Sequence, residues 1–122
     1  PADAKNRGIM NQWISYINAY IFQTLVHDIV LFRFEIMPMD QNVLEAAIPV
    51  AKEQLSLLDS TLANDAYLAG DDPSLADYFL YPIIAYLGMV PEGSLLEEFP
   101  GVSAWKARME ERTSVKESMP VL

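Results

Sequence analysis

The side chains that could carry out chemistry are few, and they stand apart from one another in the sequence. His27 is the only histidine, and Asp28 follows it directly. One histidine and one adjacent carboxylate on a helix lack the further ligands of a metal site and the nucleophile of a catalytic triad. The pairs Asp71–Asp72 and Glu97–Glu98 could act as acid and base, but adjacent carboxylates in turns are usually solvated. We therefore predict no catalytic residue and no metal ligand, and we place His27 at the surface.

One carboxylate, that of Asp77, stands in a pattern with a defined structural role. Ser74-Leu75-Ala76-Asp77 matches a capping box, in which each of the two end residues bonds the backbone amide of the other. A carboxylate in the first turn also complements the positive end of the helix. We expect a helix from Leu75 to about Val90. Because that helix is apolar on every side, we expect it to be buried at the centre of the fold.

The longest expected element is a helix from Ala4 to about Ile36, since this stretch has helical apolar spacing and no proline. A polar line follows one of its sides at steps of four and three residues, and an aromatic residue continues it: Asn11, Ser15, Asn18 and Phe22. This line is either a strip that faces solvent or the wall of a binding cleft, and the spacing does not decide between the two.

The same helix carries more apolar surface than one core requires. One face holds aliphatic side chains and methionine: Met10, Ile14, Ile17, Ile21 and Leu25. A neighbouring face is mainly aromatic: Ile9, Trp13, Tyr16 and Tyr20. A helix that packs on a single core needs only one such face. The surplus predicts a second partner, either another domain, another subunit or a ligand, and we expect a twofold dimer formed through this helix.

The rest of the chain is helical as well. A second helix is expected to run from a cap at Asp40 or Asn42 to about Ala63, with Pro49 inside it. Its apolar residues form a narrow seam: Leu44, Ile48, Ala51, Leu55, Leu58 and Leu62. Further helices are expected from Pro100 or Gly101 through Glu111, and at about Ser114–Ser118. No segment reads convincingly as a strand, so we predict an all-α bundle of about five helices.

Composition excludes several classes of function. The chain has 122 residues, a formal net charge of −9 and no cysteine. This size fits one domain, and this charge disfavours nucleic acid and anionic membranes as partners. No apolar stretch is long enough to span a bilayer, and we expect no segment of this sequence to be a signal peptide. The sequence starts at Pro1, and we expect it to be part of a longer protein.

Three motifs resemble the C-terminal domain of cytosolic glutathione transferases. Tyr67-Leu68-Ala69-Gly70 followed by Pro73–Asp77 resembles the segment that leads into the central helix of that domain. Phe99–Met109 resembles its penultimate helix, and Arg7–Trp13 resembles the start of its first long helix. The resemblance implies that the whole chain, 1–122, is the all-α domain, from a protein of bacterial type. It also implies a cytoplasmic location.

The resemblance further implies where chemistry takes place in the longer protein. In this family the catalytic Ser, Tyr or Cys and most of the glutathione site lie in an N-terminal thioredoxin-like domain, which this sequence lacks. Glutathione is then a co-substrate of the longer protein, this chain holds no cofactor, and the chain alone is expected to be inactive. The C-terminal domain supplies much of the pocket for the hydrophobic electrophile, a small molecule, and part of the dimer interface.

The candidate pocket residues come from the first helix. In the bacterial beta class, an Asn two residues after a helix-opening Trp and a more distant His reach the active site. Aligned on Trp13, those positions hold Ser15 and Phe22, so an apolar and aromatic pocket is favoured over polar contacts. The implied substrate-binding residues are Ser15, Tyr16, Asn18, Tyr20 and Phe22.

A different class of function stays open. The same helical domain is reused in translation and adaptor proteins, where it is a non-enzymatic module for protein–protein interaction. A thioredoxin-like sequence upstream, with Ser, Tyr or Cys at its first turn, would favour the enzyme, and its absence would favour the interaction module.

Overall fold

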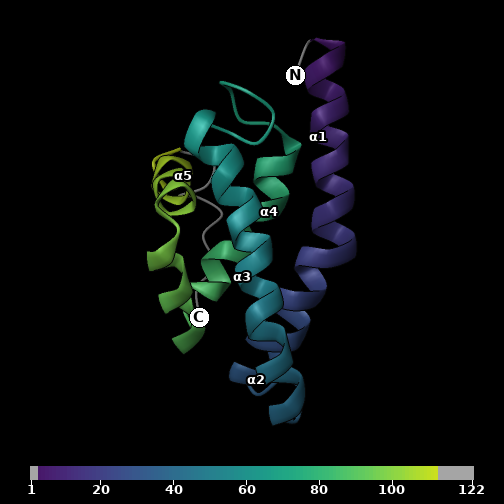
Figure 1. The fold of residues 1–122 in the computed structure, drawn as a ribbon, viewed down its shortest axis with the longest axis vertical. Coiled ribbons are helices and arrows are strands. Elements are labelled where there is room, and N and C mark those ends of the chain that lie inside the picture. Colours follow the sequence, from purple (N-terminus) through teal and green to yellow (C-terminus); the bar gives the residue numbers. More distant parts are fainter. Residues whose placement is uncertain (1–2, 113–122) are drawn as a thin grey trace.

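Helices account for most of residues 3–112, the part of the chain that the computed structural model describes (Figure 1). The elements, in chain order, are α1 (Ala4–Tyr16), η1 (Ile17–Val30), α2 (Leu31–Arg33), α3 (Gln41–Asn64), α4 (Leu75–Leu87), η2 (Pro91–Glu98) and α5 (Pro100–Glu110). In this part there is no strand, only an isolated bridge between Tyr67 and Gly70. Since α1, η1 and α2 form one continuous helix, the predicted all-α bundle of about five helices is confirmed. The predicted helix at Ser114–Ser118 lies outside the described residues.

The helices enclose one hydrophobic core. In Figure 1 the long first helix runs along one side of the molecule, α3 and α4 lie beside it, and α5 lies beyond them on the opposite side. The largest fully buried side chains come from all of these elements and from the loop before α4: Ile17, Ile21, Leu25, Ile29, Leu55, Leu58, Leu68, Leu80, Ile84, Leu87, Trp105 and Met109. One side of the first helix therefore faces the core, and its other sides are left for other contacts.

The middle of the first helix, η1, is a π-helix. In a π-helix the amide of residue i+5 donates to the carbonyl of residue i, so each turn is wider than an α-turn. At the end of η1, the amide of Leu31 donates to the carbonyl of Val26. The buried residues Ile17, Ile21 and Leu25 follow one another every four residues. A four-residue step fits both helix types, so the sequence predicted the helix but not its wider turn.

The first helix ends in a left-handed turn at Glu35, whose φ is 59°. The amide of Glu35 donates to the carbonyl of Phe32 (3.1 Å), and the amide of Ile36 donates to that of Leu31 (3.1 Å). This pair of bonds is the Schellman arrangement, in which glycine usually takes the left-handed position. A glutamate there is strained by roughly 1 kcal/mol. The turn lets the chain reverse into α3.

The second long helix, α3, matches its predicted seam. Asp40 caps it, because its carboxylate accepts from the amides of Asn42 (3.1 Å) and Val43 (3.2 Å). Of the seam residues, Ile48 is only partly buried, whereas the others are buried: Leu44, Ala51, Leu55, Leu58 and Leu62. Pro49 lies inside the helix, as predicted.

The central helix, α4, departs from its prediction on one side. It begins at Leu75 as expected, and most of its side chains are buried. Leu75 and Phe79, however, are 57% and 46% exposed. They lie four residues apart and so share one side of the helix. The prediction that α4 is buried on every side was wrong, because no element within residues 3–112 covers that side.

The last described helix, α5, is capped by a residue of another helix. Asp59 of α3 accepts hydrogen bonds from the amides of Gly101 (2.7 Å) and Val102 (3.1 Å) in the first turn of α5. A Cβ on Gly101 would lie 2.8 Å from Oδ1 of Asp59, so only glycine allows this approach. The two helices are therefore locked together at the start of α5, which begins at Pro100, one of the two predicted positions.

Candidate functional site

The side chain of Asp77 is fully buried, and its carboxylate accepts four hydrogen bonds. Oδ2 accepts from the amide (2.8 Å) and the hydroxyl (3.1 Å) of Ser74. Oδ1 accepts from the amide of Leu68 (3.0 Å) and from the indole Nε1 of Trp105 (2.9 Å). Both bonds of the predicted capping box between Ser74 and Asp77 are present. Of the four bonds to the carboxylate, the sequence pattern anticipated the one from the Ser74 amide, but not those from the Ser74 hydroxyl, the loop and α5.

These four bonds join three segments that are far apart in the sequence. The loop before α4 is held through Leu68, the start of α4 through Ser74, and α5 through Trp105, which is itself fully buried. A buried carboxylate is tolerated only when donors replace the water it has lost. Asp77 is therefore a structural residue that fixes the loop and two helices relative to each other.

An aromatic ladder runs along the first helix. The ring centroids of Trp13 and Tyr16 are 6.0 Å apart, and those of Tyr16 and Tyr20 are 5.5 Å apart. Burial raises the pKa of the Tyr16 hydroxyl, and the nearby Glu53 of α3 and Tyr20 raise it further. This hydroxyl is therefore protonated at neutral pH and is available as a hydrogen-bond donor.

The structure brings only some of the predicted pocket residues together. Tyr16 and Tyr20 are neighbours in the ladder, and the side chain of Tyr20 is 60% exposed. Ser15 and Asn18 are exposed, and Phe22 is 48% exposed. None of the five predicted residues lines the cavity at Phe32–Met39, the cavity between the start of α1 and the loop before α4, or the cavity between η1 and α3. All four residues of the polar line are exposed in the part of the chain that the structure describes.

Sequence reasoning missed a polar contact that supports the ladder. The buried Gln54 of α3 donates from Nε2 to the carbonyl of Tyr20 (3.3 Å) and to Oγ1 of Thr24 (3.0 Å), while its own Oε1 is buried without a partner. Gln54 comes three residues after the buried seam residue Ala51, and this polar residue at a core position was the available signal. The contact fixes η1 against α3 at the height of Tyr20.

The remaining candidates for chemistry stay apart in space. His27 is partly exposed, and its Nδ1 lies 2.8 Å from Oδ1 of Asp28. Asp71–Asp72 and Glu97–Glu98 are exposed. Among residues 3–112, no group of three or more His, Cys, Asp or Glu side chains could hold a metal ion. No helix in that range is both long enough and apolar enough to cross a membrane.

An all-helical bundle whose central helix starts at a Ser-x-x-Asp box is the architecture of one class of protein, the C-terminal domain of glutathione transferases. A family model described as "Glutathione S-transferase, C-terminal domain" matches residues 16–113. The chain belongs to this family.

Curated relatives agree with this assignment. A probable glutathione S-transferase of rice (Oryza sativa subsp. japonica) is 29% identical over 112 residues, which cover 92% of this chain and 49% of the relative. Glutathione S-transferase 1 of maize (Zea mays) is 32% identical over 111 residues, covering 87% and 47%. A glutathione S-transferase-like protein of a Fusarium species is 30% identical over 116 residues, covering 94% and 52%.

The chain thus spans about half the length of these curated relatives. They come from plants and a fungus, so the expected bacterial type gains no support from them.

Solved structures show the same fold. Glutathione S-transferase I of maize, in complex with an atrazine glutathione conjugate, matches with a TM-score of 0.83 at 29% identity, over 94% of this chain and 55% of that one. A glutathione transferase of Populus trichocarpa matches with a TM-score of 0.83 at 25% identity, over 95% and 56%. The predicted fold family is confirmed.

We expect the two residues of the capping box to differ strongly in their effect on stability. Ser74→Ala removes one cap and should lower the free energy of unfolding by about 1–2 kcal/mol. Asp77→Ala should lower it by about 3–5 kcal/mol, because donors on three segments lose their buried acceptor. Urea unfolding followed by circular dichroism measures both. Equal losses for the two variants would show that the bonds to Leu68 and Trp105 contribute nothing.

Proposed function

We propose that this domain forms one wall of the pocket for hydrophobic electrophiles in a full-length glutathione transferase. In the longer protein, a thioredoxin-like domain would bind glutathione and activate its thiol. The helical domain would hold the electrophile near the sulfur, and such positioning lowers the barrier for conjugation. We place the protein in the cytoplasm, on the family resemblance.

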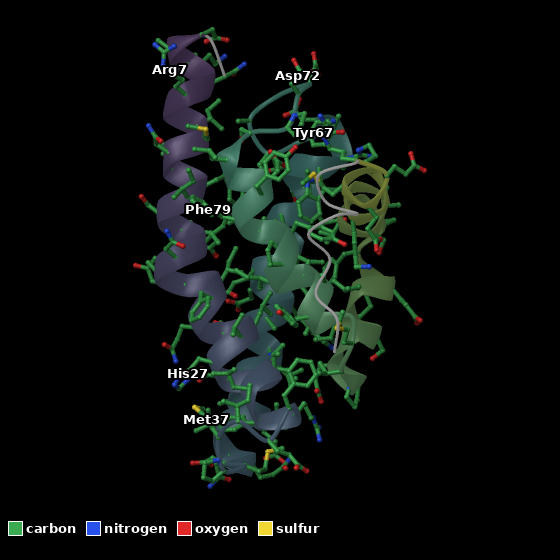
Figure 2. All side chains as sticks on the ribbon, turned by 180° about the vertical axis from the view of Figure 1, so that it is seen from behind. Arg7, His27, Met37, Tyr67, Asp72 and Phe79 are labelled. Carbon is green, nitrogen blue, oxygen red and sulfur yellow. The ribbon has the colours of Figure 1, made fainter. Side chains whose placement is uncertain are left out.

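The observation that carries the proposal is a set of large apolar side chains that the domain leaves exposed. Tyr20 and Phe22 on the first helix are 60% and 48% exposed, and Leu75 and Phe79 on α4 are exposed by similar fractions. The first helix and α4 pack against each other, and Figure 2 shows Phe79 on α4 beside the first helix. Where such side chains are contiguous on a protein surface, they often mark an interface or a ligand site. We propose that they face the electrophile and the thioredoxin-like domain.

Two related structures support the substrate class. One maize enzyme was solved with an atrazine glutathione conjugate, and another glutathione S-transferase-I was solved with lactoylglutathione. Both ligands are glutathione attached to a second group. By analogy, the present domain would contact the second group, with Tyr16, Tyr20 and Phe22 as apolar and aromatic walls and Ser15 and Asn18 at the polar edge.

The pocket is tested in the full-length protein that contains this domain. We expect Tyr20→Ala and Phe22→Ala to lower kcat/KM for an aryl halide about tenfold, because each removes apolar wall from the electrophile. The KM for glutathione should stay unchanged, because the tripeptide binds elsewhere. Steady-state kinetics with each substrate varied in turn separates the two effects.

Met89→Ala is the matched control, since Met89 is also a partly exposed apolar side chain (42%) but lies beyond the end of α4. It should leave both kinetic parameters unchanged. The 122-residue chain alone should show no conjugation, because it offers no group that activates a thiol. Activity of that chain, or full-length variants with unchanged kcat/KM for the aryl halide, would contradict the proposal. A full-length protein without a thioredoxin-like domain would favour the non-enzymatic interaction module.

A homodimer is the second part of the proposal. On α3, which packs against η1, two apolar side chains are well exposed, Val50 at 42% and Leu57 at 48%. η1 and α3 pack side by side, so their exposed residues can form one surface for a second copy. The net charge of −9 opposes this association, and salt screens the repulsion.

We therefore expect the 122-residue chain to form a dimer that is favoured at higher ionic strength. Sedimentation velocity at low and high salt, at tens of micromolar protein, measures the species present. Leu57→Glu should shift the population toward monomer, and Glu97→Gln, an exposed residue on η2, serves as control. A monomer at both salt concentrations that binds no hydrophobic dye would contradict the dimer.

A further inference from the structure

A cavity separate from the proposed electrophile wall opens between the start of α1, the end of α3 and the loop before α4. Its volume is about 380 Å³, within the range of about 300–1,000 Å³ that is usual for small-molecule sites. The residues that line it are Lys5, Asn6, Ile9, Trp13, Thr61, Asp65, Leu68, Ala69 and Gly70. Figure 2 shows that the start of the first helix, near Arg7, and the loop, near Tyr67, lie at the same end of the molecule.

The floor of this cavity is rigid. Leu68 and Ala69 are buried. They are the two central residues of a turn in which the amide of Tyr67 donates a hydrogen bond to the carbonyl of Gly70 (3.0 Å). The amide of Leu68 donates a hydrogen bond to the buried Asp77 carboxylate. Gly70 has a φ of 130°, and a Cβ there would lie 3.3 Å from Nδ2 of Asn6. The cavity therefore exists before any ligand binds, which lowers the entropy lost on binding.

The walls combine an apolar platform with a few polar groups. Ile9 and Trp13 are partly buried on α1, and the Trp13 ring is braced edge-on by Tyr16. A half-buried indole offers an apolar and aromatic surface to a ligand. Asn6 and Thr61 add neutral polar groups on opposite walls.

Two opposite charges line the cavity from different segments. Lys5 belongs to α1, and Asp65 is the capping residue that directly follows α3; both are exposed. The ion pairs found within residues 3–112 are His27–Asp28, Arg33–Glu92 and Lys106–Glu110, so neither of these two charges is paired there. A cation on one wall and an anion on the other match a ligand that carries both charges.

We propose that this cavity binds a small zwitterion of the α-amino acid class that has an apolar or aromatic side chain. The ligand carboxylate contacts Lys5, its ammonium contacts Asp65, and its side chain lies against Trp13. This activity goes beyond the conjugation role, because it involves neither glutathione chemistry nor the exposed side chains of Tyr20 and Phe22. It gives the domain a second ligand site at the Trp13 end of the aromatic ladder.

The test uses the 122-residue chain and four probes that differ by one group each. L-phenylalanine has both charges and the ring, N-acetyl-L-phenylalanine lacks the ammonium, L-phenylalaninamide lacks the carboxylate, and glycine lacks the ring. Trp13 lines the cavity while the other tryptophan, Trp105, is fully buried, so tryptophan emission reports on the site. Calorimetry gives an independent affinity, and Trp13→Phe should remove the emission change.

We expect saturable, millimolar binding of L-phenylalanine, with each of the other three probes weaker by about tenfold. Lys5→Gln should weaken L-phenylalanine to the level of the amide and leave the affinity of the amide unchanged. Asp65→Asn should weaken the binding of L-phenylalanine to the level of N-acetyl-L-phenylalanine and leave the affinity for N-acetyl-L-phenylalanine unchanged. Lys52→Gln and Asp71→Asn change the same charges at exposed positions outside the cavity, and they should have no effect.

Two results would overturn the proposal. One is the absence of saturable binding of L-phenylalanine by both fluorescence and calorimetry up to about 10 mM. The other is binding that does not distinguish the four probes, or that responds equally to the variants at Lys5 and Lys52. Circular dichroism of each variant shows that its fold is retained, which is expected because all four charged positions are exposed.

Discussion

The Asp77 carboxylate has lost all contact with water, and a buried carboxylate is stable only where donors surround it. Here the donors are supplied by the loop before α4, by the first turn of α4 and by the indole of Trp105 on α5. If any of these segments moved away from Asp77, a buried donor or the buried carboxylate would lose its hydrogen-bond partner. The arrangement of the loop and of the two helices thus depends on one side chain.

The surfaces that could bind ligands follow from this constraint. Because the loop is held at Leu68, the turn through Gly70 forms a fixed floor between α1 and α3. Because α4 starts at a fixed point, Leu75 and Phe79 are presented on its uncovered side. The long first helix borders both regions, with its Trp13–Tyr16–Tyr20 ladder near α3 and its exposed Phe22. One helix therefore takes part in the core, the proposed electrophile wall and the second cavity.

Much of the fold could be predicted from local signals in the sequence. Ser74 and Asp77 marked the start of α4, and the spacing of Leu44 to Leu62 marked the buried seam. The start of α3 was narrowed to two capping candidates, of which Asp40 is the cap. Contacts between distant segments could not be predicted this way. Nothing local to Asp59 or Asp77 indicates that one caps α5 and the other accepts from Trp105. The sequence also did not predict that η1 is a π-helix, because apolar residues spaced four apart are compatible with both α- and π-helical hydrogen bonding. The side of α4 that carries Phe79 was expected to be buried, but it is exposed. The sequence shows that this side is apolar, but it does not show which element, if any, covers it.

The central claim is that Asp77 couples α4 to α5 through the indole of Trp105, and a double-mutant cycle measures that coupling directly. Asp77→Asn and Trp105→Phe keep the approximate shape of each side chain, and urea unfolding of the parent, both single variants and the double variant gives the interaction energy. We predict a coupling of about 1 kcal/mol or more, as is usual for residues in one buried hydrogen-bond network. Additive losses, with a coupling near zero, would contradict the account.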